Sequence, residues 1–196
     1  MIIVLAVVCG YLVGSVPFGL LLTRWAGLGD IRRVGSGNIG ATNVLRTGHW
    51  GLALMTLLFD VGKAALIAFL FQHFYSLPAG LVAGTAAVLG HNYPIWLGFR
   101  GGKGVASTLG MILVLTPLTG VCACLTWLMM ALIFRYSSLS AMTALVLTPV
   151  YAWYLATPEV SLCYTALALL SLWRHRANIR RLIAGQESKI AFKRKK

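Results

Sequence analysis

Acidic residues are scarce in this sequence. Only four of its 196 residues are Asp or Glu, against 17 Lys and Arg, which leaves a formal net charge of +13 at pH 7. Phosphoryl chemistry on two metal ions needs several clustered carboxylates. The four acidic residues stand far apart in the chain, so they disfavour that chemistry and the CDP-alcohol type of phospholipid synthesis, and we expect no metal site.

The common nucleophile and metal-ligand motifs are missing as well. No Gly-x-Ser-x-Gly occurs, so a serine-hydrolase elbow has no support. None of the four histidines has an aspartate five positions later, as the His-x4-Asp acyltransferases require. Cys122-x-Cys124 has no second pair and no neighbouring histidine to complete a zinc site. We therefore expect no cofactor and no obvious nucleophile–base pair.

Long apolar segments dominate what is present. Hydrophobic residues make up 59% of the chain and charged residues 11%, and the mean hydropathy is +0.82; soluble domains have about 25% charged residues. This composition predicts an all-α integral membrane protein. The first apolar stretch, residues 2–22, lacks a basic n-region and a cleavage site, so we interpret it as a transmembrane helix.

The positive charges predict the topology. Of the 17 Lys and Arg, 16 lie in residues 24–46, 100–103, 135 and 174–196. If all four places are cytoplasmic, residues 104–134 must cross twice and turn at Pro117. We predict one domain over 1–196, with the N-terminus outside, the C-terminus in the cytoplasm, short interfacial helices and glycine-rich cytoplasmic loops. The seven spans lie near residues 2–22, 51–71, 78–98, 104–116, 118–134, 139–156 and 160–173.

The first polar stretch is rich in glycine. Its neutral and glycine residues are Gly35, Ser36, Gly37, Asn38, Gly40, Thr42 and Asn43, and Arg32, Arg33 and Arg46 add positive charge. Gly-x-Gly-x-x-Gly matches the dinucleotide fingerprint, but it follows an apolar span instead of a strand, so we reject a nucleotide site. A glycine loop before a helix N-terminus favours an anion, and we expect a phosphate. A membrane loop with incidental glycines is the alternative.

A second polar stretch comprises residues 90–94 and 99–104. Lys103 follows two glycines at an expected helix start and is a second candidate anion contact, with a positive-inside loop as the alternative. His91 and Asn92 lie at the membrane end of a span, where they line a site or bond a neighbouring helix. Asp60 and Lys63, at i and i+3, are expected to form an ion pair, with a catalytic role as the alternative.

The third stretch, residues 174–189, predicts an interfacial helix. His175, Asn178 and Leu182 share one face of it by their spacing. A purely electrostatic anchor is the alternative. The basic cluster 191–196 is expected to be attracted to anionic lipid.

Together these stretches resemble a known family. Gly35-Ser-Gly-Asn-Ile-Gly-Ala-Thr-Asn43 with Arg46, then Gly90-His-Asn-Tyr-Pro94 with Phe99-Arg-Gly-Gly-Lys-Gly104, then His175-Arg-x-Asn178 with Arg181, Gly185 and Glu187 resemble the three signature blocks of the bacterial acyl-phosphate:glycerol-3-phosphate acyltransferases. The resemblance extends over essentially the whole chain.

The resemblance implies a seven-helix enzyme of the cytoplasmic membrane with its active site facing the cytoplasm. Such an enzyme transfers a fatty acyl group from acyl phosphate to the 1-hydroxyl of glycerol 3-phosphate, and it releases lysophosphatidic acid and phosphate for phospholipid synthesis. Neither acyl-CoA nor acyl carrier protein is used directly, and no metal is needed. We expect membrane lipids as surroundings, no nucleic acid, and a monomer.

The resemblance also assigns roles to residues. The Ser36–Thr42 loop would hold the acyl phosphate group, Arg46 and Lys103 would lie near the phosphates, and His175 and Asn178 would contact glycerol phosphate. The predicted catalytic residues are Ser36, Arg46, Lys103, His175 and Asn178. The predicted substrate-binding residues are Gly37, Asn38, Gly40, Ala41, Thr42, Asn43, His91, Asn92, Gly102, Ser140 and Glu187.

The residues themselves suit a substrate that arrives activated. Cations, hydroxyls, amides and backbone N–H groups can align two anions and offset their repulsion. We hypothesise that a substrate phosphate takes the hydroxyl proton. A membrane carrier for a phosphorylated metabolite is the alternative function, although carriers usually bind near the midplane between repeated halves.

Overall fold

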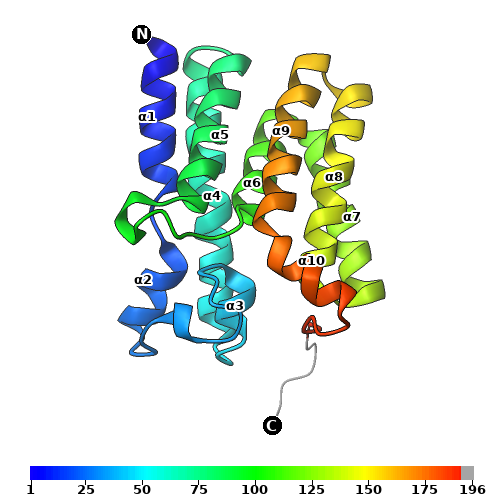
Figure 1. Cartoon of the computed structure of the whole chain (residues 1–196). Helices are drawn as coiled ribbons and strands as arrows, with labels where there is room; N and C mark the ends of the chain where they lie inside the picture. The colour runs from blue at the N-terminus through cyan, green and yellow to red at the C-terminus, as the bar shows by residue number, and fades with distance from the viewer. Residues whose placement is uncertain (191–196) are drawn as a thin grey trace. The chain divides into compact units, whose positions relative to one another are not determined.

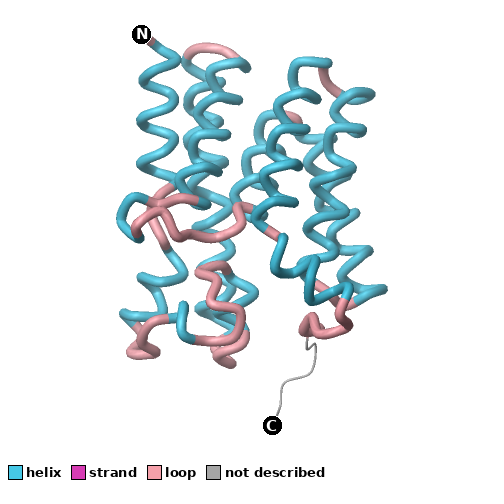
Figure 2. The backbone as a smooth tube through the Cα atoms, viewed as in Figure 1, coloured by secondary structure: helices cyan, strands magenta, loops and turns pink. Residues whose placement is uncertain are grey.

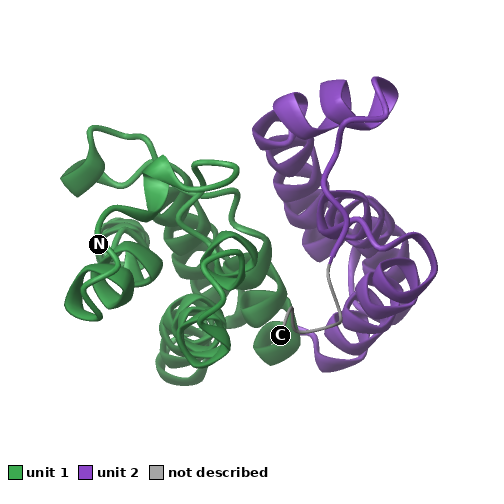
Figure 3. Ribbon diagram, turned by 90° about the horizontal axis from the view of Figure 1, so that it is seen from below, with its two compact units in different colours: residues 1–115 green, residues 116–196 purple. Residues whose placement is uncertain are grey.

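The computed structural model describes residues 1–190, and these contain helices and loops but no strand (Figure 1). The basic cluster 191–196 lies outside the described residues. The chain divides into two compact units, residues 1–115 and 116–196 (Figure 3). Each unit is described by itself.

Unit 1 is a bundle of long helices with a small helical layer at one end. Its helices are α1 (Ile2–Gly14), α2 (Phe18–Trp25), η1 (Ile31–Arg33), α3 (Ala41–Leu45), α4 (Trp50–Phe74), α5 (Leu77–Asn92), η2 (Ile95–Leu97) and α6 (Val105–Leu115). Helix α4 packs against α5 and α6, and α1 packs against α5. Leu20, Ile31, Ile39 and Val44 form a small buried core under the segment between α2 and α4.

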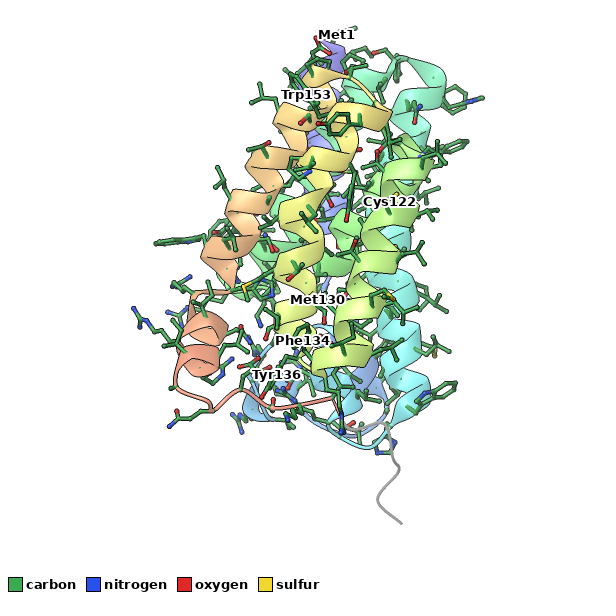
Figure 4. The ribbon with its side chains drawn as sticks, turned by 90° about the vertical axis from the view of Figure 1, so that its right-hand side faces the viewer. Met1, Cys122, Met130, Phe134, Tyr136 and Trp153 are labelled. Atoms are coloured by element: carbon green, nitrogen blue, oxygen red, sulfur yellow. The ribbon has the colours of Figure 1, made fainter. Side chains whose placement is uncertain are left out.

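The described residues of unit 2 form three long helices and one short one. They are α7 (Pro117–Phe134), α8 (Ser137–Leu155), α9 (Pro158–Arg174) and α10 (Arg176–Ile183), and α8 packs against both α7 and α9. Proline begins α7 and α9, where its missing N–H costs nothing. Figure 4 shows Tyr136 and Trp153 at opposite ends of α8.

The composition of the helices is that of an integral membrane protein, as the sequence predicts. Residues 2–25, α4, α7 and α8 are each long and apolar enough to cross a membrane, and α6 is a shorter apolar helix. Their outward faces carry exposed leucines such as Leu66 and Leu132, which lipid can cover. The predicted helix break at Pro117 is confirmed, since α6 ends at Leu115 and α7 begins at Pro117.

Two predicted helix boundaries are wrong. Residues 2–22 do not form one helix, because Pro17 lacks an N–H and α1 ends at Gly14 before α2 starts at Phe18. The segment 78–98 is helical only as far as Asn92. Tyr93 precedes Pro94, and the residue before a proline is displaced from helical geometry. Residues 93–98 therefore form a loop that contains η2.

Small residues allow α1 to approach α5 closely. A Cβ atom on Gly10 would collide with the carbonyl oxygen of Ala83, and one on Gly14 with that of Ala87. Such small-residue contacts are a common basis of helix packing in membranes.

We expect Gly14→Val to lower the Tm of the detergent-solubilised protein by about 5–10 °C, since ~1 kcal/mol corresponds to roughly 2–4 °C in a chain of this size. The added side chain must push α1 away from α5. Gly62→Ala on α4 is the matched control, because a Cβ atom there meets nothing within 4 Å. Equal Tm values for the two variants would show that close helix approach does not stabilise this unit.

Candidate active site

The first glycine-rich loop joins η1 to α3 in unit 1 (Figure 2). Gly35 and Gly37 have φ angles of +55° and +70°, which glycine adopts without strain. A Cβ atom on Gly35 would lie 2.6 Å from Asn43 Oδ1, so the loop folds directly over the Asn43 amide. Helix α2 supports the other side, where Gly19 packs against the carbonyl of Ile39.

Asn43 organises this loop. Its Nδ2 donates to the carbonyl oxygens of Ile31, Val34 and Asn38 at 3.1, 2.9 and 2.8 Å. Its Oδ1 accepts from the Ser36 backbone N–H at 3.0 Å and from the Ser36 hydroxyl at 3.2 Å. The side chain is only 2% exposed. The sequence predicts that Asn43 contacts substrate, whereas these hydrogen bonds show that its side chain holds the loop in shape.

Charge around this loop is unevenly distributed. Arg32 forms an ion pair with Asp30, which Arg24 joins at 3.2 Å. The hydrogen bond from Arg32 holds the pKa of Asp30 far below its usual range. Arg32 is thus compensated locally, although the sequence counted it among the loop's cations. Arg46 remains beside Gly35, with its guanidinium 3.4 Å from Asn43 Oδ1.

The predicted residues of the first block therefore lie together. Gly37, Asn38, Gly40, Ala41 and Thr42 follow Ser36 along one short loop, and Ser36, Thr42 and Arg46 are exposed. Helix α3 spans only five residues. Its dipole is correspondingly small, so backbone N–H groups, hydroxyls and Arg46 are the means by which this loop can bind an anion.

The second loop joins α5 to α6 and lies back against the end of α5 (Figure 2). Gly101 N–H donates to the Asn92 carbonyl at 3.2 Å, and Gly102 N–H donates to the His91 carbonyl at 3.0 Å. Lys103 follows, half-buried, just before the first turn of α6. The Asn92 side chain is fully buried, and neither its oxygen nor its nitrogen has a hydrogen-bond partner among the described residues.

In unit 2, His175 lies at the junction of α9 and α10. Its Nδ1 is 2.8 Å from the Ser171 carbonyl oxygen, and the ring is 2% exposed. A carbonyl can only accept, so Nδ1 carries a hydrogen and donates it to Ser171. Asn178 lies one turn further along α10 and is also buried.

A carboxylate holds the third block together. Glu187 accepts from the Asn178 amide at 2.6 Å, the Ser138 hydroxyl at 2.7 Å and Arg181 Nε at 2.7 Å. Burial alone would raise the pKa of Glu187, but these three bonds and the Arg181 charge outweigh it and leave the pKa below its ordinary value.

Sequence reasoning missed the role of Ser138. It selected Ser140 instead, whose buried hydroxyl donates to the carbonyl of Tyr136 on its own helix at 2.8 Å. Ser138 and Glu187 are 49 residues apart, and no local pattern links them. The residues after α10 return toward the start of α8, where Ile190 N–H donates to the Arg135 carbonyl at 2.6 Å.

Replacing the Glu187 carboxylate by an amide tests how much the charge of Glu187 stabilises the protein. We expect Glu187→Gln to lower the Tm at about pH 7 by roughly 3–8 °C, because hydrogen bonds to a charged group contribute about 1.5–3 kcal/mol. The native pKa lies below the ordinary value of 4.5, so the stabilisation is present above that value and is lost as the pH falls through the native pKa. The Tm gap should therefore narrow in acid.

Glu159→Gln, at the exposed start of α9, is the control and should change Tm little. A Tm gap for Glu187→Gln that stays constant between about pH 7 and pH 4 would contradict this role of the charge.

The fold and these loops define a polytopic helical membrane protein with cationic, glycine-rich loops. Comparison with known proteins is more specific. The family model for glycerol-3-phosphate acyltransferase matches residues 4–185. The chain is 57% identical to the glycerol-3-phosphate acyltransferase of Rhodospirillum rubrum, covering 95% of this chain and 90% of that protein. It is 56% identical to the enzyme of the same name from Paramagnetospirillum magneticum, over 98% and 96%.

Solved structures agree with this result. Two crystal structures of PlsY (YgiH), an integral membrane glycerol 3-phosphate acyltransferase, match with TM-scores of 0.92 and 0.89. The first is a glycerol 3-phosphate form at 34% identity, covering 96% of both chains. The second is a lysophosphatidic acid form at 32% identity, covering 96% of this chain and 95% of that one. This chain belongs to the glycerol-3-phosphate acyltransferase family, and the resemblance of its three sequence blocks is confirmed.

Proposed function

We propose that this protein transfers a fatty acyl group from acyl phosphate to the 1-hydroxyl of glycerol 3-phosphate and releases lysophosphatidic acid and phosphate. The family supports the acceptor and the product. The observation that carries the choice of donor is the kind of residues in the loops: cations, hydroxyls, amides and backbone N–H groups. An acyl phosphate already contains a good leaving group, so alignment and charge neutralisation are sufficient.

Each polar block has a role in this proposal. The residues Ser36, Gly37, Asn38, Gly40, Ala41 and Thr42 bind the acyl phosphate group through N–H groups and hydroxyls, with Asn43 shaping their loop. Arg46 and Lys103 neutralise phosphate charge. The buried amide of Asn92 gains the hydrogen-bond partner that it lacks, beside His91 and Gly102. His175 and Asn178 contact glycerol phosphate, and Glu187 holds Asn178.

A substrate phosphate takes the proton from the attacking hydroxyl. Asp30, Asp60 and Glu187 each form an ion pair with Arg or Lys, which disfavours them as general bases. When the hydroxyl oxygen bonds to the acyl carbon, the acyl–phosphate C–O bond breaks and inorganic phosphate leaves. The bonds and the proton in this step are accounted for without a metal ion.

The charges also support the proposed membrane arrangement. Seven spans, with the N-terminus outside and the C-terminus inside, place 16 of the 17 Lys and Arg on the cytoplasmic side. In this proposal the enzyme lies in the cytoplasmic membrane with its polar loops facing the cytoplasm, and it acts as a monomer.

The test uses purified, detergent-solubilised full-length protein with palmitoyl phosphate and glycerol 3-phosphate in the presence of a chelator. We expect phosphate and lysophosphatidic acid, identified by mass, to appear in equal amounts. Lysophosphatidic acid formed from palmitoyl-CoA alone would refute the proposed donor. Folded protein that binds glycerol 3-phosphate but forms neither product would refute the enzyme and favour the carrier, which uptake into proteoliposomes would then reveal.

A further inference from the structure

A buried charged cluster in unit 1 contains two residues, Asp60 and Lys63, that have no role in the proposed chemistry, together with His91. Lys63 Nζ lies 2.8 Å from Asp60 Oδ1, 2.9 Å from His91 Nδ1 and 3.0 Å from the carbonyl oxygen of Val16. The Lys63 side chain is only 3% exposed. Phe18 covers it, with the ring centre 5.7 Å from Nζ. The cluster thus joins α4, α5 and the break between α1 and α2.

The side chains of this cluster lie close together around Lys63. The Lys63 ammonium group can only donate, and it is surrounded by the Asp60 carboxylate, the Val16 carbonyl and the His91 ring. His91 Nδ1 faces this charged pair, 2.9 Å from Lys63 Nζ and 3.4 Å from Asp60 Oδ1. The His91 ring is held in one orientation by a charge on the neighbouring helix.

The other side of that ring meets the loop that carries Lys103. A Cβ atom on Gly102 would overlap His91 Nε2, so only glycine lets the loop lie against the ring. The Gly102 N–H donates to the His91 carbonyl. On the far side of Lys103, the Ser107 hydroxyl donates to the carbonyl of Asp60 at 2.9 Å. Lys103 therefore lies in the sequence between Gly102 and Ser107, and each of these two residues contacts a residue of the cluster.

Stability alone gives no reason for charge at this place. Well-packed apolar residues of similar volume often replace a buried ion pair at no cost. Ionic and hydrogen-bonded contacts also fix the orientation of the side chains that form them, which apolar packing does not. We propose that Asp60, Lys63 and His91 form a positioning network that fixes the loop at residues 101–104 and thereby places Lys103 for the reaction. Its kinetic consequences rest on the function proposed above.

The substitution His91→Asn is designed to keep the contact with Lys63 and to remove the contact with Gly102. An Asn oxygen can stand in for Nδ1 and accept from Lys63, but the side chain is too short to reach the Nε2 position beside Gly102. We expect kcat/KM to fall about 10- to 30-fold, equivalent to roughly 1.4–2 kcal/mol, while Tm changes little. Hydrogen exchange at the Gly101 and Gly102 amides should become faster, and this readout does not depend on activity.

Gly102→Ala tests the same contact from the loop side. The added methyl collides with His91 Nε2, so we expect a loss similar to that of His91→Asn. In the double variant the collision is gone, because Asn ends short of the methyl. The double variant should be no less active than the worse single variant. Gly51→Ala, where a Cβ atom meets nothing within 4 Å, is the control.

The outcomes separate two kinds of failure. If wild-type protein turns over but the losses of the two substitutions multiply, the His91–Gly102 contact does not position the loop and the network is refuted. If wild-type protein is inactive, the proposed function fails, and the exchange rates alone decide about the network. Unchanged exchange at Gly101 and Gly102 in His91→Asn would overturn it in either case.

Discussion

Lys103→Met is expected to lower kcat/KM by about 10³-fold, equivalent to ~4 kcal/mol of lost transition-state stabilisation. Met keeps the length and the apolar stem of the side chain and removes only the ammonium group. Lys103 is half-buried and follows two glycines that bond back to α5, so its charge is held in place before substrate arrives. Removing even one preorganised donor typically costs 10²–10³ in turnover, and here a full charge beside phosphate is lost.

Steady-state phosphate release in detergent measures this effect. Arg100→Met removes a charge three residues earlier, at an exposed position, and should change kcat/KM less than about threefold, as surface charges usually do. Lys103→Arg keeps the charge but changes its geometry, so intermediate activity is expected. A Lys103→Met variant with activity near that of Arg100→Met would remove Lys103 from the proposed reaction.

Local signals in the sequence were sufficient for some features of this fold. The apolar runs predicted the helical membrane architecture, and Pro117 predicted the boundary between α6 and α7. The i, i+3 spacing of Asp60 and Lys63 predicted their ion pair. Each of these depends on residues that are neighbours in the chain, so a pattern in one segment contains the necessary information.

Other features depend on partners that are distant in the chain. Lys63 and His91 are 28 residues apart, and their contact depends on how α4 packs against α5. The helix break before Phe18 was missed because hydropathy continues across Pro17. Ser138 was missed because its hydroxyl has no special spacing relative to Glu187. Composition identifies the polar residues, but only packing determines which of them meet.

The same distinction between local pattern and packing applies to the role of Asn43. The family resemblance placed it among the substrate contacts, and the structure shows its amide bonded to Ile31 of η1 and to Val34, Ser36 and Asn38 of the loop. These two roles make different predictions about substitution. A substrate contact can lose one hydrogen bond, whereas the centre of the loop can lose the shape of the whole anion-binding segment.

Asn43→Asp is therefore expected to reduce kcat/KM by at least about 10²-fold, a loss of roughly 2.7 kcal/mol or more. The substitution is isosteric, but it turns the Nδ2 donor into a carboxylate oxygen that faces three backbone carbonyls. These carbonyls then lose their partner and meet a negative charge at a buried position. The loop must open, and Ser36 and Arg46 move with it.

His49→Asp controls for the added negative charge. His49 is exposed and lies just before the first residue of α4, where Asp is a favourable N-cap, so this variant should fold and remain active. Faster hydrogen exchange across residues 34–40 in Asn43→Asp, and not in His49→Asp, would tie the loss to the loop. If Asn43→Asp left exchange unchanged and raised only the KM for substrate, Asn43 would be a substrate contact, and the loop would keep its shape by other means.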